Sequence, residues 1–215
     1  MQCFNSLQKY DLNGLIYSKV VFDRPMIKMG KMRLLEPQKR ISSKKIENDN
    51  EKRSVRRSRT VVKDYVKTNL ELKYFVTYTL DPSKINRYDE KKIYMKIRDW
   101  LSNCVKRKEL QYILVPEKHK DGAWHFHGFT NKPLEWKYGF CRIVEIDREK
   151  DMGKIINYAI SYVRKDMEMF NGRRYLHSQN LSKPGKIYSN VDFNKEPGKL
   201  IELEELGVKM KIQEE

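Results

Sequence analysis

Two histidines separated by one residue are the strongest chemical signal in the sequence. His125 and His127 lie in residues 124–129, whose aromatic content is typical of a β-strand. Side chains alternate along a strand, so both imidazoles point to the same face and can hold one metal ion. Taken alone, the pair is as consistent with surface histidines or a structural metal site as with a catalytic one.

A carboxylate across a hairpin turn can complete this site. Asp121-Gly122 is a turn signal, and residues 111–115 before it are predicted as a strand. The hairpin brings Glu117, eight residues before His125, across from the histidine pair. A mixed imidazole and carboxylate site with open positions suits Mn²⁺ or Mg²⁺ and a phosphate-bearing substrate. The candidate metal ligands are therefore His125, His127 and Glu117.

Two tyrosines and a lysine share one shoulder of a helix predicted over residues 149–167. Tyr158, Tyr162 and Lys165 are spaced by four and three residues, which brings them to one face. Beside them runs an apolar stripe that consists of Met152, Ile155, Ile156, Ala159, Val163 and Met167. One interpretation is that the tyrosines lie at the core edge with their hydroxyls in water. The other is that they react, because the Lys165 cation can stabilise a tyrosinate or a phosphate.

An antiparallel sheet is expected to position these groups. Strands rich in β-branched and aromatic residues are predicted over residues 74–80, 111–115, 124–129 and 140–146, with a short one near 175–176. Apolar residues at helical spacing predict helices over residues 60–68, 88–106 and 149–167. This order indicates the α+β class, with helices that flank a central antiparallel sheet.

The charge of the chain indicates a polyanionic partner. The 215 residues carry 45 Lys and Arg against 29 Asp and Glu, a formal net charge of +16. This excess favours a nucleic acid, because basic side chains displace counterions from a phosphate backbone. An acidic membrane surface is the competing explanation, but no basic amphipathic helix supports it. No apolar stretch approaches the roughly 20 residues of a membrane span, and the start does not resemble a secretory signal.

Composition divides the chain into three expected segments. Residues 1–60 are predicted to be a basic N-terminal extension or arm, because residues 40–59 are polar and charge-dense. Their arginines are interpreted either as a solvated helix surface or as a phosphate-contacting arm. Residues 61–182 contain the candidate site, and residues 183–215 are expected to be peripheral. Three widely spaced cysteines predict neither a disulfide framework nor a cysteine zinc site, which favours a reducing cytoplasm.

Three motifs, in this order, resemble those of the HUH endonucleases, in particular the rolling-circle replication initiators of bacterial plasmids and single-stranded DNA phages. Residues 75–79, FVTYT, resemble the FxTxT strand of that family. His125-Phe126-His127 resembles its His–hydrophobic–His pair, and residues 158–165 resemble its helical YxxxYxxK motif. The resemblance covers roughly residues 70–170, and the ordered combination is much more specific than any one motif.

The resemblance implies roles for these residues on a palm-like sheet similar to that of RNA-recognition motifs. His125, His127 and Glu117 would bind the divalent metal ion. Tyr162 is the expected nucleophile because only it is followed by lysine at the YxxK position, and Tyr158 is a possible second nucleophile. Phage initiators with two catalytic tyrosines often have lysine between them, where this chain has Ser161.

The resemblance also implies a reaction. The protein would nick single-stranded origin DNA in a bacterial cytoplasm, leaving a 5′-phosphotyrosine link and a free 3′-hydroxyl that primes a host polymerase. No GxxxxGK[ST] motif indicates an ATPase motor, so a host helicase or an extruded hairpin would supply the single strand. The alternatives are a single-tyrosine HUH transposase and a non-catalytic nucleic-acid-binding module with a structural metal site. A conjugative relaxase is disfavoured by the motif order.

Overall fold

The computed structural model describes residues 3–27, 43–147, 150, 152–163, 169–203 and 208–214. The chain divides into two compact units, one formed by Met1–Arg40 together with Lys183–Glu215, and the other by Ile41–Ser182. The motifs of the candidate site all lie in Ile41–Ser182. Each unit is described by itself.

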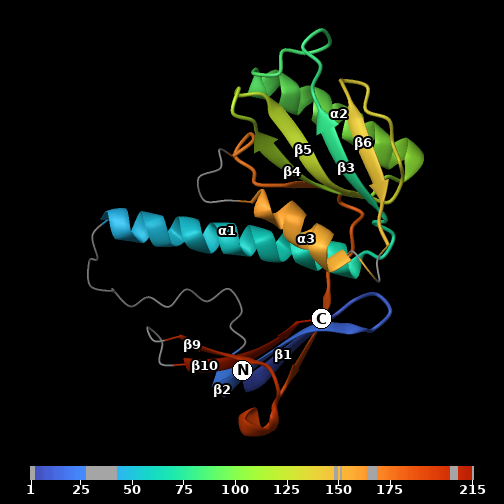
Figure 1. The fold of residues 1–215 in the computed structure, drawn as a ribbon. Coiled ribbons are helices and arrows are strands. Elements are labelled where there is room, and N and C mark those ends of the chain that lie inside the picture. Colours follow the sequence, from blue (N-terminus) through green and yellow to red (C-terminus); the bar gives the residue numbers. More distant parts are fainter. Residues whose placement is uncertain are drawn as a thin grey trace. The chain divides into compact units, whose positions relative to one another are not determined.

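The unit Ile41–Ser182 is built on a five-stranded antiparallel sheet with the strand order β6-β3-β5-β4-β7 (Figure 1). The strands are β3 (Tyr74–Thr79), β4 (Tyr112–Lys118), β5 (Trp124–Thr130), β6 (Cys141–Glu145) and β7 (Leu176–His177). Helices flank this sheet, so the predicted α+β class is confirmed. The histidine pair lies on β5, the central strand.

The two faces of this sheet are covered by different helices. Helix α2 (Glu90–Lys108) buries Ile93, Ile97 and Leu101 in a core that also contains Trp124 and Phe126 of β5. Helices α1 (Ser43–Thr68) and α3 (Met152–Ser161) contribute to a second core. That core contains Val55, Val62, Val66, Ile156 and Ala159 from the helices and Ile113, Val115 and Phe129 from the sheet.

Strand alternation sends the candidate site residues to the face with α1 and α3. Trp124 and Phe126 are each 1% exposed on the α2 side, as expected from the sequence. His125 and His127 must therefore point to the opposite face. Antiparallel pairing sets His127 opposite Thr77 of β3, and it sets His125 opposite Glu117 of β4. Directly opposed residues share a face, so the sheet gathers these side chains.

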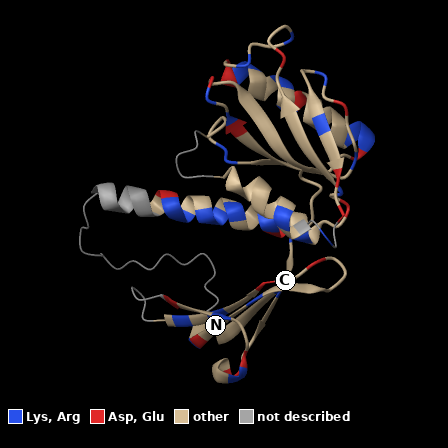
Figure 2. Ribbon diagram, in the orientation of Figure 1, with Lys and Arg blue, Asp and Glu red and all other residues tan. Residues whose placement is uncertain are grey.

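The helices differ from their predicted bounds. A short helix was expected over residues 60–68, whereas α1 begins at Ser43, so the predicted segment boundary after residue 60 falls inside it. The reason is that Val55 is buried and continues the inward stripe of α1 into the charge-dense stretch. Figure 2 shows Lys and Arg along α1, where Arg53, Arg56 and Arg57 are exposed.

The helix that carries the tyrosines is shorter than predicted. It was expected over residues 149–167, whereas α3 ends at Ser161. Tyr162 and Val163 follow in a turn, and their amides donate to the carbonyls of Ala159 and Ile160 at 3.3 and 3.0 Å. Lys165 lies outside the described residues.

The predicted arm and the predicted peripheral segment contribute strands to one sheet. Its order is β8-β1-β2-β10-β9, and every pairing is antiparallel. The strands are β1 (Cys3–Tyr10), β2 (Ile16–Ile27), β8 (Gly185–Ser189), β9 (Lys199–Leu203) and β10 (Val208–Glu214). The unit therefore joins the two ends of the sequence, and its boundary before residue 183 coincides with the expected one.

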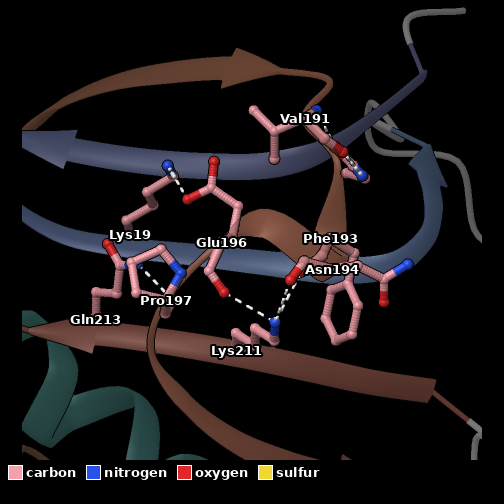
Figure 3. Close-up of polar contacts among 9 residues, drawn as sticks. Lys19, Val191, Phe193, Asn194, Glu196, Pro197, Lys211 and Gln213 are labelled. Atoms are coloured by element: carbon pink, nitrogen blue, oxygen red, sulfur yellow. Dashed lines mark hydrogen bonds and ion pairs between the residues drawn. The ribbon is translucent and has the colours of Figure 1, made fainter.

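Side chains also tie the segment between β8 and β9, which includes the 3₁₀ turn η1 (Phe193–Lys195), to this sheet (Figure 3). The Asn5 amide nitrogen donates to the Val191 carbonyl, and its oxygen accepts from the Val191 amide, both at 2.8 Å. The Lys211 ammonium donates to the carbonyls of Phe193 and Glu196 at 2.8 Å. These bonds hold residues 191–196 against strands from both ends of the chain.

The close approach of β4 and β5 gives a test of the site-bearing sheet. A Cβ at Gly128 would lie 2.0 Å from the Ile113 carbonyl oxygen and 2.8 Å from the Leu114 Cα, so Gly128→Ala forces the backbone apart. We expect this substitution to lower the free energy of unfolding by more than about 2 kcal/mol. Urea unfolding followed by tryptophan fluorescence measures it, because all three tryptophans lie in Ile41–Ser182.

Gly153→Ala in α3 is the matched control. A Cβ there meets nothing within 4 Å, and alanine in a helix is favoured over glycine by up to about 1 kcal/mol. The control should therefore be neutral or stabilising. A change of less than about 0.5 kcal/mol for Gly128→Ala would contradict the strand packing.

Candidate active site

His127 is held from both sides by the strands that neighbour β5. It is 6% exposed. Its Nδ1 lies 3.1 Å from the Thr77 Oγ1 on β3, and its Nε2 lies 3.1 Å from the Glu117 Oε2 on β4. Both ring nitrogens therefore have partners, and these fix the orientation of the imidazole.

The protonation of His127 suits metal binding. Burial lowers the pKa of His127, although the Glu117 carboxylate acts in the opposite direction. A neutral imidazole carries one N–H, and the Thr77 hydroxyl can either donate to Nδ1 or accept from it. When Thr77 accepts from Nδ1–H, the lone pair of Nε2 faces the Glu117 carboxylate. A lone pair and a carboxylate that face each other form a site for a cation.

His125 is joined by a histidine that the motif analysis did not single out. The ring of His125 stacks on that of His119, with centroids 3.5 Å apart and planes 20° apart. Burial first, and then the neighbouring histidines, lower the pKa of His125 to about 4, so its imidazole is neutral near pH 7. The alternation that predicts the positions of Glu117 and His125 also puts His119 on their face, two residues after Glu117. This parity was the available signal for His119.

The donor chemistry of these residues fits a divalent cation. Glu117 Oε2 and His127 Nε2 lie 3.1 Å apart, a separation compatible with two ligands that each lie about 2.1 Å from a shared ion. His125 lies beside them on the same face, with its ring against His119. The described part of the chain contains no group of three or more His, Cys, Asp or Glu side chains arranged to hold a metal ion. The structure thus brings two of the three predicted ligands into contact.

Tyr162 lies flat on His127. The two rings are parallel to within 4°, and their centroids are 4.1 Å apart. The Tyr162 hydroxyl donates a short hydrogen bond to the Tyr158 hydroxyl. Burial, this hydrogen bond and the negative charge of Glu117 all raise the pKa of Tyr162, so its hydroxyl is protonated in this arrangement. Added positive charge near the hydroxyl would favour the tyrosinate.

Tyr158 connects this stack to solvent. Its side chain is 53% exposed, and its ring makes an edge contact with Phe75 of β3 at 5.8 Å. Phe75, Thr77 and Thr79 of the FxTxT strand share the face of His127, but they act differently. Thr77 contacts His127, whereas the Thr79 hydroxyl donates to the Phe140 carbonyl at 3.2 Å.

Arg59 of α1 holds the chain directly after Tyr162. Its Nε donates to the Val163 carbonyl at 2.7 Å. The sequence analysis grouped Arg59 with the other arginines of α1, and its contact joins positions 104 residues apart. No local pattern distinguishes it from Arg56 or Arg57, so sequence reasoning could not have found it.

The comparisons with known proteins point to DNA replication. Residues 73–167 match a family of replication-associated proteins, described under the name ORF2, and this segment contains all three motifs. The match is consistent with a rolling-circle replication initiator and supports a partner that is DNA. Searches of curated proteins and of solved structures gave no match. Within the described residues, every helix is too short or too polar to span a membrane.

Removal of the Arg59 contact should loosen the stack of Tyr162 on His127. Arg59→Ala leaves the carbonyl of the buried Val163 without this donor, which costs about 1–2 kcal/mol of stability. We expect the ring protons of His127 to lose most of the ring-current shift that Tyr162 induces, as measured by NMR. Arg57→Ala removes the same charge from an exposed position of α1 and should leave that shift unchanged. Equal shifts in both variants would show that Arg59 does not position Tyr162.

Proposed function

We propose that this protein is a rolling-circle replication initiator that nicks single-stranded origin DNA by a tyrosine transesterification. The observation that carries the proposal is the parallel stack of Tyr162 on His127. It brings the tyrosine motif onto the histidine motif in a segment similar to replication-associated proteins. The net charge of +16 supports a nucleic-acid substrate.

The nicking step exchanges one phosphodiester for another. The Tyr162 oxygen attacks the scissile phosphorus, forming a phosphotyrosine bond as the bond to the 3′-oxygen breaks. The 5′ end stays on the protein, and the released 3′-oxygen takes up a proton to become a hydroxyl. Bond energy is conserved, so the strand can later be rejoined. Tyr158 can serve as the second nucleophile for that rejoining.

The proton of Tyr162 has a path out of the site. The Tyr162 hydroxyl already donates to the Tyr158 hydroxyl, which can pass its own proton to water because that side chain is exposed. Lys165, three residues after Tyr162 in the sequence, is proposed to stabilise the charge on the phosphate, as the motif implies.

Glu117, His127 and His125 are proposed to hold a Mn²⁺ or Mg²⁺ ion. When bound, such an ion neutralises charge on the phosphoryl oxygens and favours ionisation of a nearby hydroxyl. Thr77 fixes the Nδ1 side of His127, which keeps Nε2 turned to Glu117. The 3′-hydroxyl would then prime a host polymerase, and a host helicase would supply single strands in a bacterial cytoplasm.

A non-catalytic nucleic-acid-binding module is the second candidate, because one observation favours it. The raised pKa of Tyr162 is what a purely structural tyrosine would show. Such a module would bind single strands reversibly and form no covalent link.

Covalent capture separates these functions. The protein is incubated with Mn²⁺ and a labelled single-stranded oligonucleotide from the origin of its own replicon, and protein-linked DNA is resolved on a denaturing gel. We expect Tyr162→Phe to reduce adduct formation by at least about 1,000-fold, because loss of a nucleophile leaves only binding and electrostatic contributions. Removal of metal with a chelator should abolish the adduct, and re-addition of Mn²⁺ should restore it.

Three further variants make the result specific. His127→Ala should reduce the adduct by at least about 100-fold, whereas Tyr158→Phe should retain it. Tyr138→Phe, a tyrosine in contact with the core on the α2 side, is the control and should behave as wild type. Loss of the adduct in Tyr158→Phe alone would exchange the roles of the two tyrosines. Tight binding without any adduct in the wild type would refute the catalytic proposal in favour of the binding module.

A further inference from the structure

We infer that a cavity of about 380 Å³ beside Tyr158 binds one nucleotide of the single-stranded substrate. The inference rests on the proposed function, and it assigns the part of the site that recognises the DNA strand. The cavity lies among β3, β6 and α3, and it is lined by Phe75, Thr77, Arg142, Val144, Lys154, Ile155 and Tyr158.

The cavity adjoins the reactive groups. The pairing of β3 with β6 sets Thr77 opposite Arg142 and Phe75 opposite Val144, so these four side chains share the face of His127. Two lining residues contact the candidate active site directly. Thr77 contacts His127, and Tyr158 accepts the hydrogen bond of Tyr162. A nucleotide in this cavity would therefore lie next to the scissile phosphate.

The walls of the cavity suit a flat, apolar group. Phe75 and Tyr158 meet edge to face at 63°, and Val144 and Ile155 supply aliphatic surface. Val144 is 40% exposed and Tyr158 is 53% exposed, so apolar surface stays open to solvent on a highly charged chain. Exposed apolar surface that lines a concavity indicates a ligand site. Nucleobases stack on such surfaces whatever their sequence.

Two cations give the cavity its preference for a nucleotide over an uncharged apolar ligand. Arg142 and Lys154 line it and are exposed. Among the described residues, no acidic side chain lies within ion-pair distance of either one, so both are available to phosphate oxygens. Aromatic and aliphatic walls combined with two cations match the base and the phosphate of one nucleotide.

The test measures equilibrium binding without cleavage. Fluorescence anisotropy of the full chain in a chelator gives the affinity for a single-stranded origin oligonucleotide, with an abasic site placed at each position around the nick in turn. We expect one position at which the wild type loses roughly 10-fold in affinity, the range of one stacked base. Val144→Trp fills the cavity, so it should weaken the intact oligonucleotide by a similar factor and abolish that abasic penalty.

Matched variants isolate the cavity. Glu145→Trp adds the same ring to the same strand on the opposite face, and it should keep the abasic profile of the wild type. Arg142→Gln should weaken every oligonucleotide and reduce the slope of log affinity against log salt by about 0.7, one phosphate contact. Its counterpart Arg107→Gln, on α2, should leave the slope unchanged.

The outcomes are distinct. An unchanged abasic profile in Val144→Trp would overturn the inference, as would equally strong competition by a free deoxynucleoside monophosphate, which would indicate a site for free nucleotides. If no adduct forms but the base-dependent coupling persists, only the catalytic proposal falls. If adducts form without base dependence at this cavity, only the present inference falls.

Discussion

The contact between Tyr162 and His127 depends on how the sheet holds the imidazole. His127 is fixed by Thr77 on one side and by Glu117 on the other, so its ring offers a flat surface in a constant orientation. Tyr162 comes directly after α3, whose Ile156 and Ala159 are buried against the same sheet face. Arg59 then secures the next residue of the chain. The position of the proposed nucleophile thus follows from core packing and one long-range hydrogen bond.

The electrostatics of the site oppose those of the chain as a whole. The protein carries a net charge of +16, yet its two central histidines are neutral near pH 7 and Glu117 raises the pKa of Tyr162. The resulting site accepts added positive charge, which favours both a divalent cation and Lys165 as its complement. The available cations of the described residues lie next to the site, at Arg142 and Lys154, where a DNA backbone can follow them.

Local periodicity predicted the parts of the fold that local forces decide. Alternation along 124–129 gave the correct faces of His125 and His127, and the Asp121-Gly122 turn gave the pairing of Glu117 with His125. Long-range contacts were not predictable. Strands β1 and β8 pair across most of the chain, as Leu7 opposite Tyr188 shows. The early end of α3 and the contact of Arg59 with Val163 depend in the same way on tertiary packing.

The position of the covalent link tests the central claim most directly. After reaction with single-stranded origin DNA and nuclease trimming, trypsin releases residues 155–164, which contain both Tyr158 and Tyr162. Tandem mass spectrometry then locates the nucleotide on one tyrosine. The structure predicts the 5′-phosphate on Tyr162, which stacks on His127. A modification confined to Tyr158, or an unmodified peptide under conditions in which the DNA is bound, would contradict this account.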